Sequence, residues 1–297
     1  MSDPAQVLKE LKREREFLIG IDSDGCAFDT MEIKHKECFI PNIIKFWNLQ
    51  AISKYAREAA EFVNLYSKWR GLNRFPALIK VFDLLAEREE VCQRGFKLPD
   101  STTLKDWVET ETKLGNPALE KKVNETNDPI LKITLEWTLA VNRAIADLVH
   151  GVPPYPYVRE SLAKAQTHAQ VIVVSQTPNE ALEREWAEHD LVKYLKVIAG
   201  QEMGSKGECL GFAKAAGKYE DDQVLMIGDA PGDLKAAKIN NALFYPINPG
   251  DEDQSWQRFH DEALDKFING RYRGAYEAKL IAEFEAYLPS TPPWKNG

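Results

Sequence analysis

The sequence predicts an α/β protein in which a doubly wound, mostly parallel sheet carries an inserted all-helical domain. Two observations predict this fold class. Short apolar runs of strand length occur at residues 17–22 and recur only after residue 169, where helical patterns alternate with them. Between these regions, residues 31–150 show amphipathic helical patterns and no convincing strand. The chain of 297 residues is long enough for two domains.

The first predicted strand is the run FLIGID, residues 17–22. A continuous apolar run, rather than an alternating one, is typical of a strand buried on both faces of a parallel sheet. Similar runs follow the helical region: QVIVVSQ (170–176), YLKVIAG (194–200), VLMIGD (224–229) and ALFYPIN (242–248). Helical patterns such as NEALEREWAEHD and ECLGFAKAAGKY separate them, so the order of elements indicates βαβ units.

The inserted region ends in clear stop signals. Its last helical pattern begins at Asp128-Pro129 and ends before Gly151, which suits a helix C-terminus. The segment GVPPYPY that follows is proline-rich, as a return linker requires. We therefore expect an α/β core formed by residues 1–30 and 152–250, a helical domain at 31–151, and a C-terminal helical extension at 251–297 that packs on the core.

The composition excludes several classes of function. The formal net charge is −8 and no basic block is present, so nucleic acid is not an expected partner. No apolar run approaches the length of about 18 residues that a membrane span needs, and the polar N-terminus does not resemble a signal peptide. The cysteines are scattered without a CxxC pair, which suits a reducing compartment. We expect a cytoplasmic protein with no membrane partner.

Three predicted strands end in residues that can carry chemistry. Asp22 ends the first strand, Ser175 follows the second and Asp229 ends the fourth. In open α/β sheets, ligands bind outside the carboxyl ends of the strands, so we expect these side chains to meet at one edge. Asp24 follows Asp22 in the same loop, and Asp233 follows Asp229.

Two helix starts near this edge predict an anion site. After Ser175, Thr177 and Glu180 fit a capping box around Pro178, and a helix N-terminus beside a hydroxyl group suits a phosphate. A second capping box, Ser205 to Glu208, places Lys206 in the first turn of a helix. The helix dipole disfavours a cation there unless a negative group lies nearby.

Each of these residues also has a structural interpretation. Asp22 alone fits a turn at the end of a strand, Asp233 fits the first turn of a helix, and Ser175 and Lys206 alone fit an ordinary serine and a solvated lysine. Asp29 is best interpreted as the start of the first inserted helix. Only the combination of Asp22, Asp24 and Asp229 favours a functional site over these alternatives.

The combination resembles a known family. Asp22-Ser23-Asp24-Gly25 with Asp29-Thr30, then Ser175, Lys206 and the run Gly228 to Asp233, are similar in kind and order to motifs I to IV of the haloacid dehalogenase (HAD) superfamily. The insertion resembles a type C1 cap, and the resemblance extends over residues 17–250. It implies a Rossmann-like core.

Cys26 departs from the usual Thr or Val of motif I, and a small buried side chain is favoured there over an oxidisable thiol.

The resemblance implies a role for each residue of the predicted site. Asp22 would be the nucleophile that forms an aspartyl-phosphate, and Asp24 the general acid and base. Asp22, Asp24 through its backbone carbonyl, Asp229 and Asp233 would hold Mg²⁺. The residues expected to bind the transferring phosphoryl group are Ser175, Gln176 and Lys206.

Substrate specificity is expected to lie in the helical domain. In the segment KWRGLNRFP (68–76), Arg70 and Arg74 are candidates for contact with an anionic substrate. In the segment EIKHKE (32–37), Lys34 and His35 are further candidates for the same contact. The alternative is that these residues are solvated charges near helix ends.

The sequence therefore predicts a Mg²⁺-dependent phosphohydrolase that acts on a small phosphorylated metabolite. Two alternatives remain open: a HAD phosphotransferase or mutase, and a non-catalytic HAD-like binding or scaffold protein. A scaffold would use the helical domain or the aromatic residues after 255 as its surface, although their spacing is more typical of core packing. The leaving group and the oligomeric state are not set by the sequence.

Overall fold

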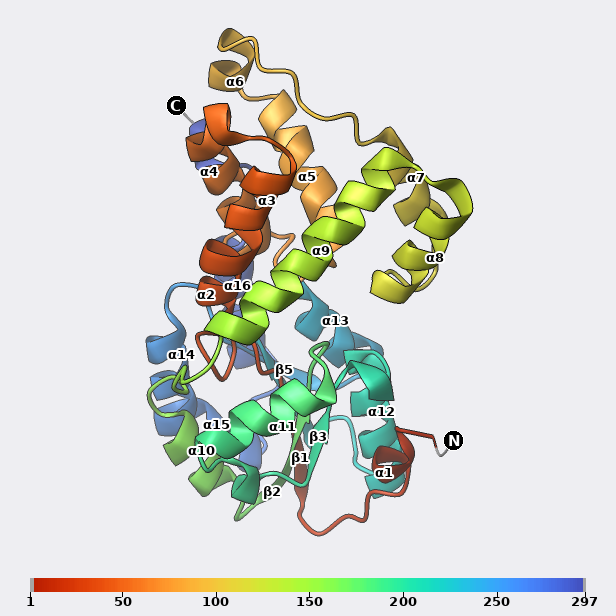
Figure 1. Ribbon diagram of the computed structural model, residues 1–297. Helices are drawn as coiled ribbons and strands as arrows, with labels where there is room; N and C mark the ends of the chain where they lie inside the picture. Colours follow the sequence, from red (N-terminus) through yellow and green to blue (C-terminus); the bar gives the residue numbers. More distant parts are fainter. Residues whose placement is uncertain (1–2, 296–297) are drawn as a thin grey trace. The chain divides into compact units, whose positions relative to one another are not determined.

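A computed structural model describes residues 3–295 (Figure 1). It contains a parallel sheet of five strands in the order β3-β2-β1-β4-β5. The strands are β1 (Phe17–Ile21), β2 (Ala169–Val174), β3 (Val197–Ala199), β4 (Val224–Gly228) and β5 (Leu243–Pro246). Each overlaps the apolar run that predicted it. The predicted doubly wound α/β fold with an inserted helical domain is confirmed.

Helices cover both faces of the sheet because side chains alternate between the faces along each strand. Ile19 and Val171 point into one core, whereas Leu18 and Ile172 point into the other. The first face packs against α10 (Val158–Ala165), α11 (Asn179–Glu188), α14 (Glu252–Arg258) and α15 (Leu264–Ile268). The second packs against α1 (Gln6–Lys9), α12 (Lys206–Gly217), α13 (Pro231–Ile239) and α16 (Ala275–Tyr287).

The register of the sheet brings three strand ends to one edge. Ile21, the last residue of β1, is paired with Val173 of β2 and with Ile227 of β4. The residues that follow these three strands therefore leave the sheet at the same level. This edge carries the loops in which the candidate residues lie.

The chain divides into two compact units. One comprises the residues up to Thr30 together with Gly151–Leu288, and contains the sheet. The other comprises Met31–His150 together with the residues from Pro289 onward, and is helical. We call them the sheet unit and the helical unit.

The helical unit has its own aromatic core. The ring of Phe75 meets the rings of Trp107 and Trp137 edge to face, with centroids 5.0 Å and 6.5 Å away. Its elements are α2 (Thr30–Ile33, which begins at the boundary), a π-helical segment (Lys34–Phe39), α3 (Ile40–Phe46), α4 (Ser53–Asn64), α5 (Arg74–Ala86), α6 (Glu89–Gln93), α7 (Thr102–Thr110), α8 (Asn116–Thr126) and α9 (Pro129–Leu148). Among the described residues, no helix combines the length and the apolar composition that a membrane span requires.

The C-terminal extension divides between the units. Trp256, Phe259 and Phe267 are buried in the core of the sheet unit, so their interpretation as core residues is confirmed. From Pro289 onward, however, the chain belongs to the helical unit, where the Trp294 ring lies 5.7 Å from that of Phe62 and 4.5 Å from the guanidinium carbon of Arg88. The expectation that the whole extension packs on the core is wrong for this last segment, because the aromatic residue there finds its partners in the helical unit.

Candidate active site

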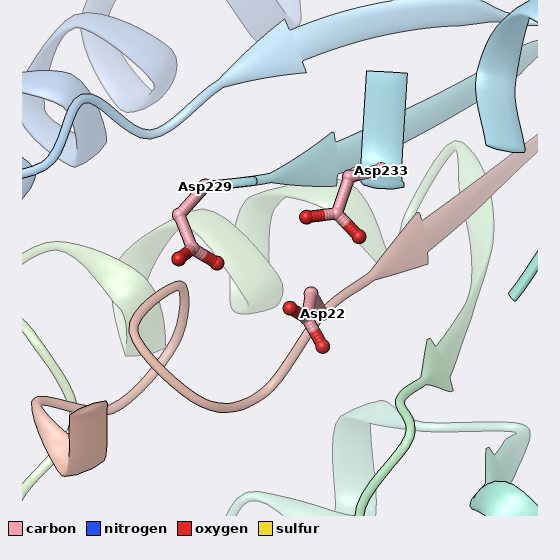
Figure 2. Close-up of side chains that lie close together, drawn as sticks. All are labelled: Asp22, Asp229 and Asp233. Carbon is pink, nitrogen blue, oxygen red and sulfur yellow. The ribbon is translucent and has the colours of Figure 1, made fainter. Parts of the chain in front are cut away.

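Three buried aspartates converge at the carboxyl ends of β1 and β4 (Figure 2). Asp22 directly follows β1, Asp229 directly follows β4, and Asp233 lies in the first turn of α13. One carboxylate oxygen from each lies within 4.8 Å of the others, and the relative exposures are 4%, 1% and 0%. The parallel register explains the meeting, because it places the two strand ends side by side.

Lys206 completes this cluster. It is the first residue of α12, which begins with the predicted capping box between Ser205 and Glu208. The Lys206 Nζ atom lies 2.6 Å from Asp22 Oδ2 and 2.6 Å from Asp233 Oδ1. The negative groups that a cation at this helix start requires are therefore present.

The cluster has more negative than positive charge. Burial raises the pKa of the Asp22 carboxyl well above its ordinary value, Lys206 opposes this, and Asp233 and Asp229 add to it. Burial also disfavours the charged form of Lys206, but the carboxylates outweigh it and raise the pKa of the ammonium group above its ordinary value. The cluster contains three carboxyl groups and one ammonium group. Because hard carboxylate oxygens are the ligands that divalent cations such as Mg²⁺ prefer, the residues present fit a divalent metal.

The loop after β1 fixes the orientation of Asp22. Its Oδ1 atom accepts a hydrogen bond from the backbone N–H of Ser23 at 2.8 Å, while Oδ2 faces Lys206. Gly25 has a φ of +75°, a conformation that glycine adopts without strain. The Cys26 side chain is fully buried and burial raises the pKa of its thiol, so its interpretation as a small core residue is confirmed.

Asp233 contacts both the start of its own helix and the cluster. Its Oδ2 atom accepts from the backbone N–H of Ala230 at 3.0 Å, as an acidic residue near a helix start does, and its Oδ1 atom faces Lys206. The absence of a side chain at Gly228 makes room for it, because a Cβ atom there would lie 2.3 Å from the Asp233 Cβ and Cγ atoms. The helix-capping interpretation and the cluster interpretation therefore do not exclude each other.

The Asp24 carboxylate lies outside the aspartate cluster and is held by two hydroxyl groups. Thr30 Oγ1 donates to Asp24 Oδ1 at 2.5 Å, and Thr177 Oγ1 donates to Asp24 Oδ2 at 2.7 Å. The predicted capping box after Ser175 is wrong. Helix α11 begins at Asn179, and the Thr177 hydroxyl group bonds to Asp24 instead of capping it.

The predicted phosphate-binding residues differ in their surroundings. Ser175 is buried at the end of β2, and its Oγ atom accepts from the backbone N–H of Thr177 at 3.3 Å. Gln176 is exposed, and its side-chain amide donates to the backbone carbonyl of Gly204 at 3.1 Å. The structure thus places Ser175 at the same sheet edge as Asp22, whereas the Gln176 amide is engaged by a neighbouring loop.

The predicted specificity residues lie in the helical unit. His35 is buried and stacks on Phe39 with ring centroids 4.7 Å apart, and Lys34 begins the same π-helical segment. Arg70 is buried and its Nη1 atom donates to the backbone carbonyl of Leu65 at 2.9 Å. Solvation, the alternative considered for these side chains, is therefore wrong for His35 and Arg70.

Arg74 is the first residue of α5 and is partly buried. Its Nη1 atom donates to Thr138 Oγ1 at 2.6 Å and to Asn142 Oδ1 at 2.8 Å, and its guanidinium carbon lies 5.1 Å from the centre of the Phe39 ring. Burial lowers the pKa of Arg74 to about 10. In the described part of the chain no carboxylate pairs with this cation.

Sequence reasoning missed two tryptophans that support the loop after β1. Trp256 Nε1 donates to the backbone carbonyl of Cys26 at 2.7 Å, and Trp186 Nε1 donates to Ser23 Oγ at 2.9 Å. Both indoles are fully buried. A buried tryptophan needs an acceptor for its N–H group, but the sequence offered no signal of which one.

Comparison with known proteins identifies the family. The model of the haloacid dehalogenase-like hydrolases matches residues 83–245, more than half of the chain. The chain therefore belongs to the haloacid dehalogenase-like hydrolases, and the prediction of a HAD-superfamily enzyme is confirmed. The matched range begins after the loop that carries Asp22 and Asp24, so it does not include them.

Solved structures of the same superfamily are similar to this chain. A haloacid dehalogenase-like family hydrolase from Streptococcus pneumoniae is 12% identical, with 83% of this chain and 91% of that chain covered and a TM-score of 0.46. A subfamily IA HAD-superfamily hydrolase from Geobacter sulfurreducens is 15% identical, with coverages of 80% and 90% and a TM-score of 0.41. A comparison with curated proteins gave no match. The family assignment rests on the family model.

Proposed function

We propose that this protein is a Mg²⁺-dependent phosphohydrolase that acts on a small phosphorylated metabolite through an aspartyl-phosphate intermediate. The observation that carries the proposal is the buried cluster of Asp22, Asp229, Asp233 and Lys206. Such a cluster is costly to bury without a further positive charge. Binding of a divalent cation together with a phosphoryl group would give this cluster a function.

In the first half-reaction, an Asp22 oxygen attacks phosphorus and the bond from phosphorus to the ester oxygen breaks. The hydrogen bond from the Ser23 N–H and the ion pair with Lys206 orient the nucleophile. Asp24 delivers a proton to the departing oxygen, so the leaving group departs as a neutral alcohol.

In the second half-reaction, a water molecule attacks the phosphorus of the aspartyl-phosphate while Asp24 accepts its proton. The bond from phosphorus to the Asp22 oxygen breaks, inorganic phosphate leaves, and the free carboxylate returns. Ser175, Gln176 and Lys206 are the residues proposed to hold the phosphoryl oxygens.

Asp22, Asp229 and Asp233, with the backbone carbonyl of Asp24, are the proposed ligands of Mg²⁺. When bound, the ion offsets negative charge on the phosphoryl group and on the cluster. The fit is supported by three hard, buried oxygen donors within 4.8 Å of one another.

We further propose that the helical unit acts as a C1-type cap and selects the substrate through Arg74, Arg70, Lys34 and His35. Arg74 offers the most direct support. A partly desolvated guanidinium at a helix N-terminus, bonded only to neutral acceptors and an aromatic ring, is a favourable receptor for an anion. A substrate with a second acidic group fits this chemistry.

The test is phosphate release from a panel of phosphomonoesters with Mg²⁺ and with a chelator, for wild type and Asp22→Asn. We expect metal-dependent turnover that the substitution lowers by about 10³-fold or more. Asp29→Asn is the matched control, because Asp29 lies exposed in the same loop and outside the cluster; it should retain activity.

Other outcomes would contradict the proposal in distinct ways. Mg²⁺ binding without phosphate release from any ester, but with transfer to an added alcohol, would favour a phosphotransferase or mutase. Neither metal binding nor turnover would favour the scaffold alternative. Turnover that survives Asp22→Asn would exclude Asp22 as the nucleophile.

A further inference from the structure

We propose that Thr177 is a positioning residue that holds the Asp24 carboxyl group in the direction required for proton transfer to the leaving group. The inference rests on the proposed function and adds a residue to it. Its basis is the hydrogen bond from Thr177 Oγ1 to Asp24 Oδ2 at 2.7 Å. This bond joins the loop after β2 to the loop after β1.

A carboxyl group needs such a partner because rotation about its last side-chain bond is soft. Thr30 holds one Asp24 oxygen at 2.5 Å and Thr177 holds the other at 2.7 Å, so the plane of the carboxyl group is fixed from two sides. A hydroxyl group can both donate and accept, so Thr177 can keep its bond to Asp24 before and after the proton moves.

The backbone of Thr177 is itself held in place. Its carbonyl accepts from the N–H of Gln201 at 3.1 Å, and its N–H donates to Ser175 Oγ at 3.3 Å. Gly200 packs directly against this segment, since a Cβ atom there would lie 2.7 Å from the Thr177 carbonyl oxygen. The hydroxyl group is therefore presented from a rigid support, as the positioning of a catalytic group requires.

Helix capping does not account for the Thr177 hydroxyl group. Helix α11 begins at Asn179 with Pro178 in the cap position, and the N–H group of Asn179 donates to Glu202 Oε2 at 3.0 Å. Thr177 precedes that cap and directs its hydroxyl group to a residue far away in sequence. Its role therefore lies with Asp24 rather than with the helix.

The test uses two esters of similar size whose leaving groups need protonation to different extents: p-nitrophenyl phosphate and benzyl phosphate. The nitrophenolate ion leaves readily without a proton, whereas benzyl alkoxide does not. For Thr177→Val, we expect kcat/KM for benzyl phosphate to fall by about tenfold or more and that for p-nitrophenyl phosphate to change by less than about twofold. The ratio kcat/KM is used because it reports the steps up to departure of the leaving group.

Two variants complete the test. Thr177→Ser keeps the hydroxyl group and should restore the wild-type preference between the esters. Thr167→Val is the matched control, because Thr167 is exposed and its hydroxyl group bonds to the Lys164 carbonyl; it should alter neither rate. Thermal melting of each variant separates a folding defect from a change in selectivity.

The inference is overturned if Thr177→Val lowers kcat/KM equally for both esters, which would indicate a role in phosphoryl binding or folding, or if it lowers neither. These results leave the proposed function intact as long as wild-type turnover depends on Asp22. If the wild type hydrolyses neither ester nor any other phosphomonoester, the proposed function fails and this inference fails with it.

Discussion

Lys206 of the sheet unit and Arg74 of the helical unit occupy similar local positions with opposite surroundings. Each is the first residue of a helix, where the backbone dipole disfavours a cation, and each has lost part of its contact with water. Lys206 faces two carboxylates at 2.6 Å, whereas Arg74 bonds to a hydroxyl group and an amide. The pKa of Lys206 is raised above its ordinary value, and that of Arg74 is lowered to about 10.

The difference indicates which charge each region can still accept. Around Lys206, negative charge exceeds positive charge, so that region can accept another cation. Around Arg74, no carboxylate among residues 3–295 pairs with the positive charge, so that region can accept an anion. The two regions therefore suit ligands of opposite charge, a divalent cation at the cluster and an anion at Arg74.

The largest effect is expected from Lys206→Met, which removes the only cation seen in the described cluster and leaves buried carboxylates without compensation. We expect a loss of about 3 kcal/mol in the free energy of unfolding and loss of most activity. Millimolar Mg²⁺ should recover part of the stability but little of the activity. Urea denaturation with and without Mg²⁺ measures the first, and phosphate release the second.

Arg74→Met is the matched variant for that experiment. It removes a cation whose partners are neutral, so we expect a loss of about 1 kcal/mol or less and no dependence on Mg²⁺. Equal losses for the two variants would contradict the contrast between the two cations.

A smaller effect is expected from Gly228→Ala, which displaces the Asp233 carboxylate from Lys206 without removing a charge. The new Cβ atom would lie 2.3 Å from the Asp233 Cβ and Cγ atoms, so Asp233 must move away from Lys206. We expect a loss of about 2 kcal/mol in the free energy of unfolding and about tenfold in kcat.

Gly232→Ala makes the same chemical change in the first turn of α13, where an added Cβ atom meets nothing within 4 Å. A helical alanine there should stabilise α13 slightly and preserve activity. If Gly228→Ala behaves like this control, the close packing at Asp233 has no functional consequence.

The smallest effect is expected from Arg74→Ala. We expect KM to rise several-fold, equivalent to about 1 kcal/mol, for phosphate esters with a second acidic group, while KM for p-nitrophenyl phosphate stays nearly unchanged. Steady-state kinetics on both substrates measures this. Arg143→Ala, at an exposed position of α9, serves as the control for loss of a positive charge in the helical unit. Equal changes in KM for the two substrates would remove Arg74 from substrate recognition.

The sequence predicted the parts of this molecule that are encoded locally. Continuous apolar runs identified the strands because burial on both faces leaves no room for polar alternation. Recognisable signals at strand ends and helix starts predict Asp22, Asp229 and Lys206, and parallel strands bring those ends together.

Contacts between distant loops were not predictable in this way. Thr177 fits a local capping rule, but its bond to Asp24 depends on how two loops pack, which the sequence pattern does not encode. The same holds for Trp256 and the Cys26 carbonyl, which lie 230 residues apart. The bond from the Gln176 amide to the Gly204 carbonyl likewise joins two loops and has no signal in the sequence.

The segment from Pro289 onward has a consequence for protein engineering. Because Trp294 packs against Phe62 and Arg88, the helical unit is assembled from two separate stretches of the gene. A chimera that exchanges only residues 31–150 for another helical domain would leave the Trp294 indole without its partners. The transplantable cassette is the insertion together with this tail, and a swap that omits the tail is expected to yield an aggregation-prone hybrid.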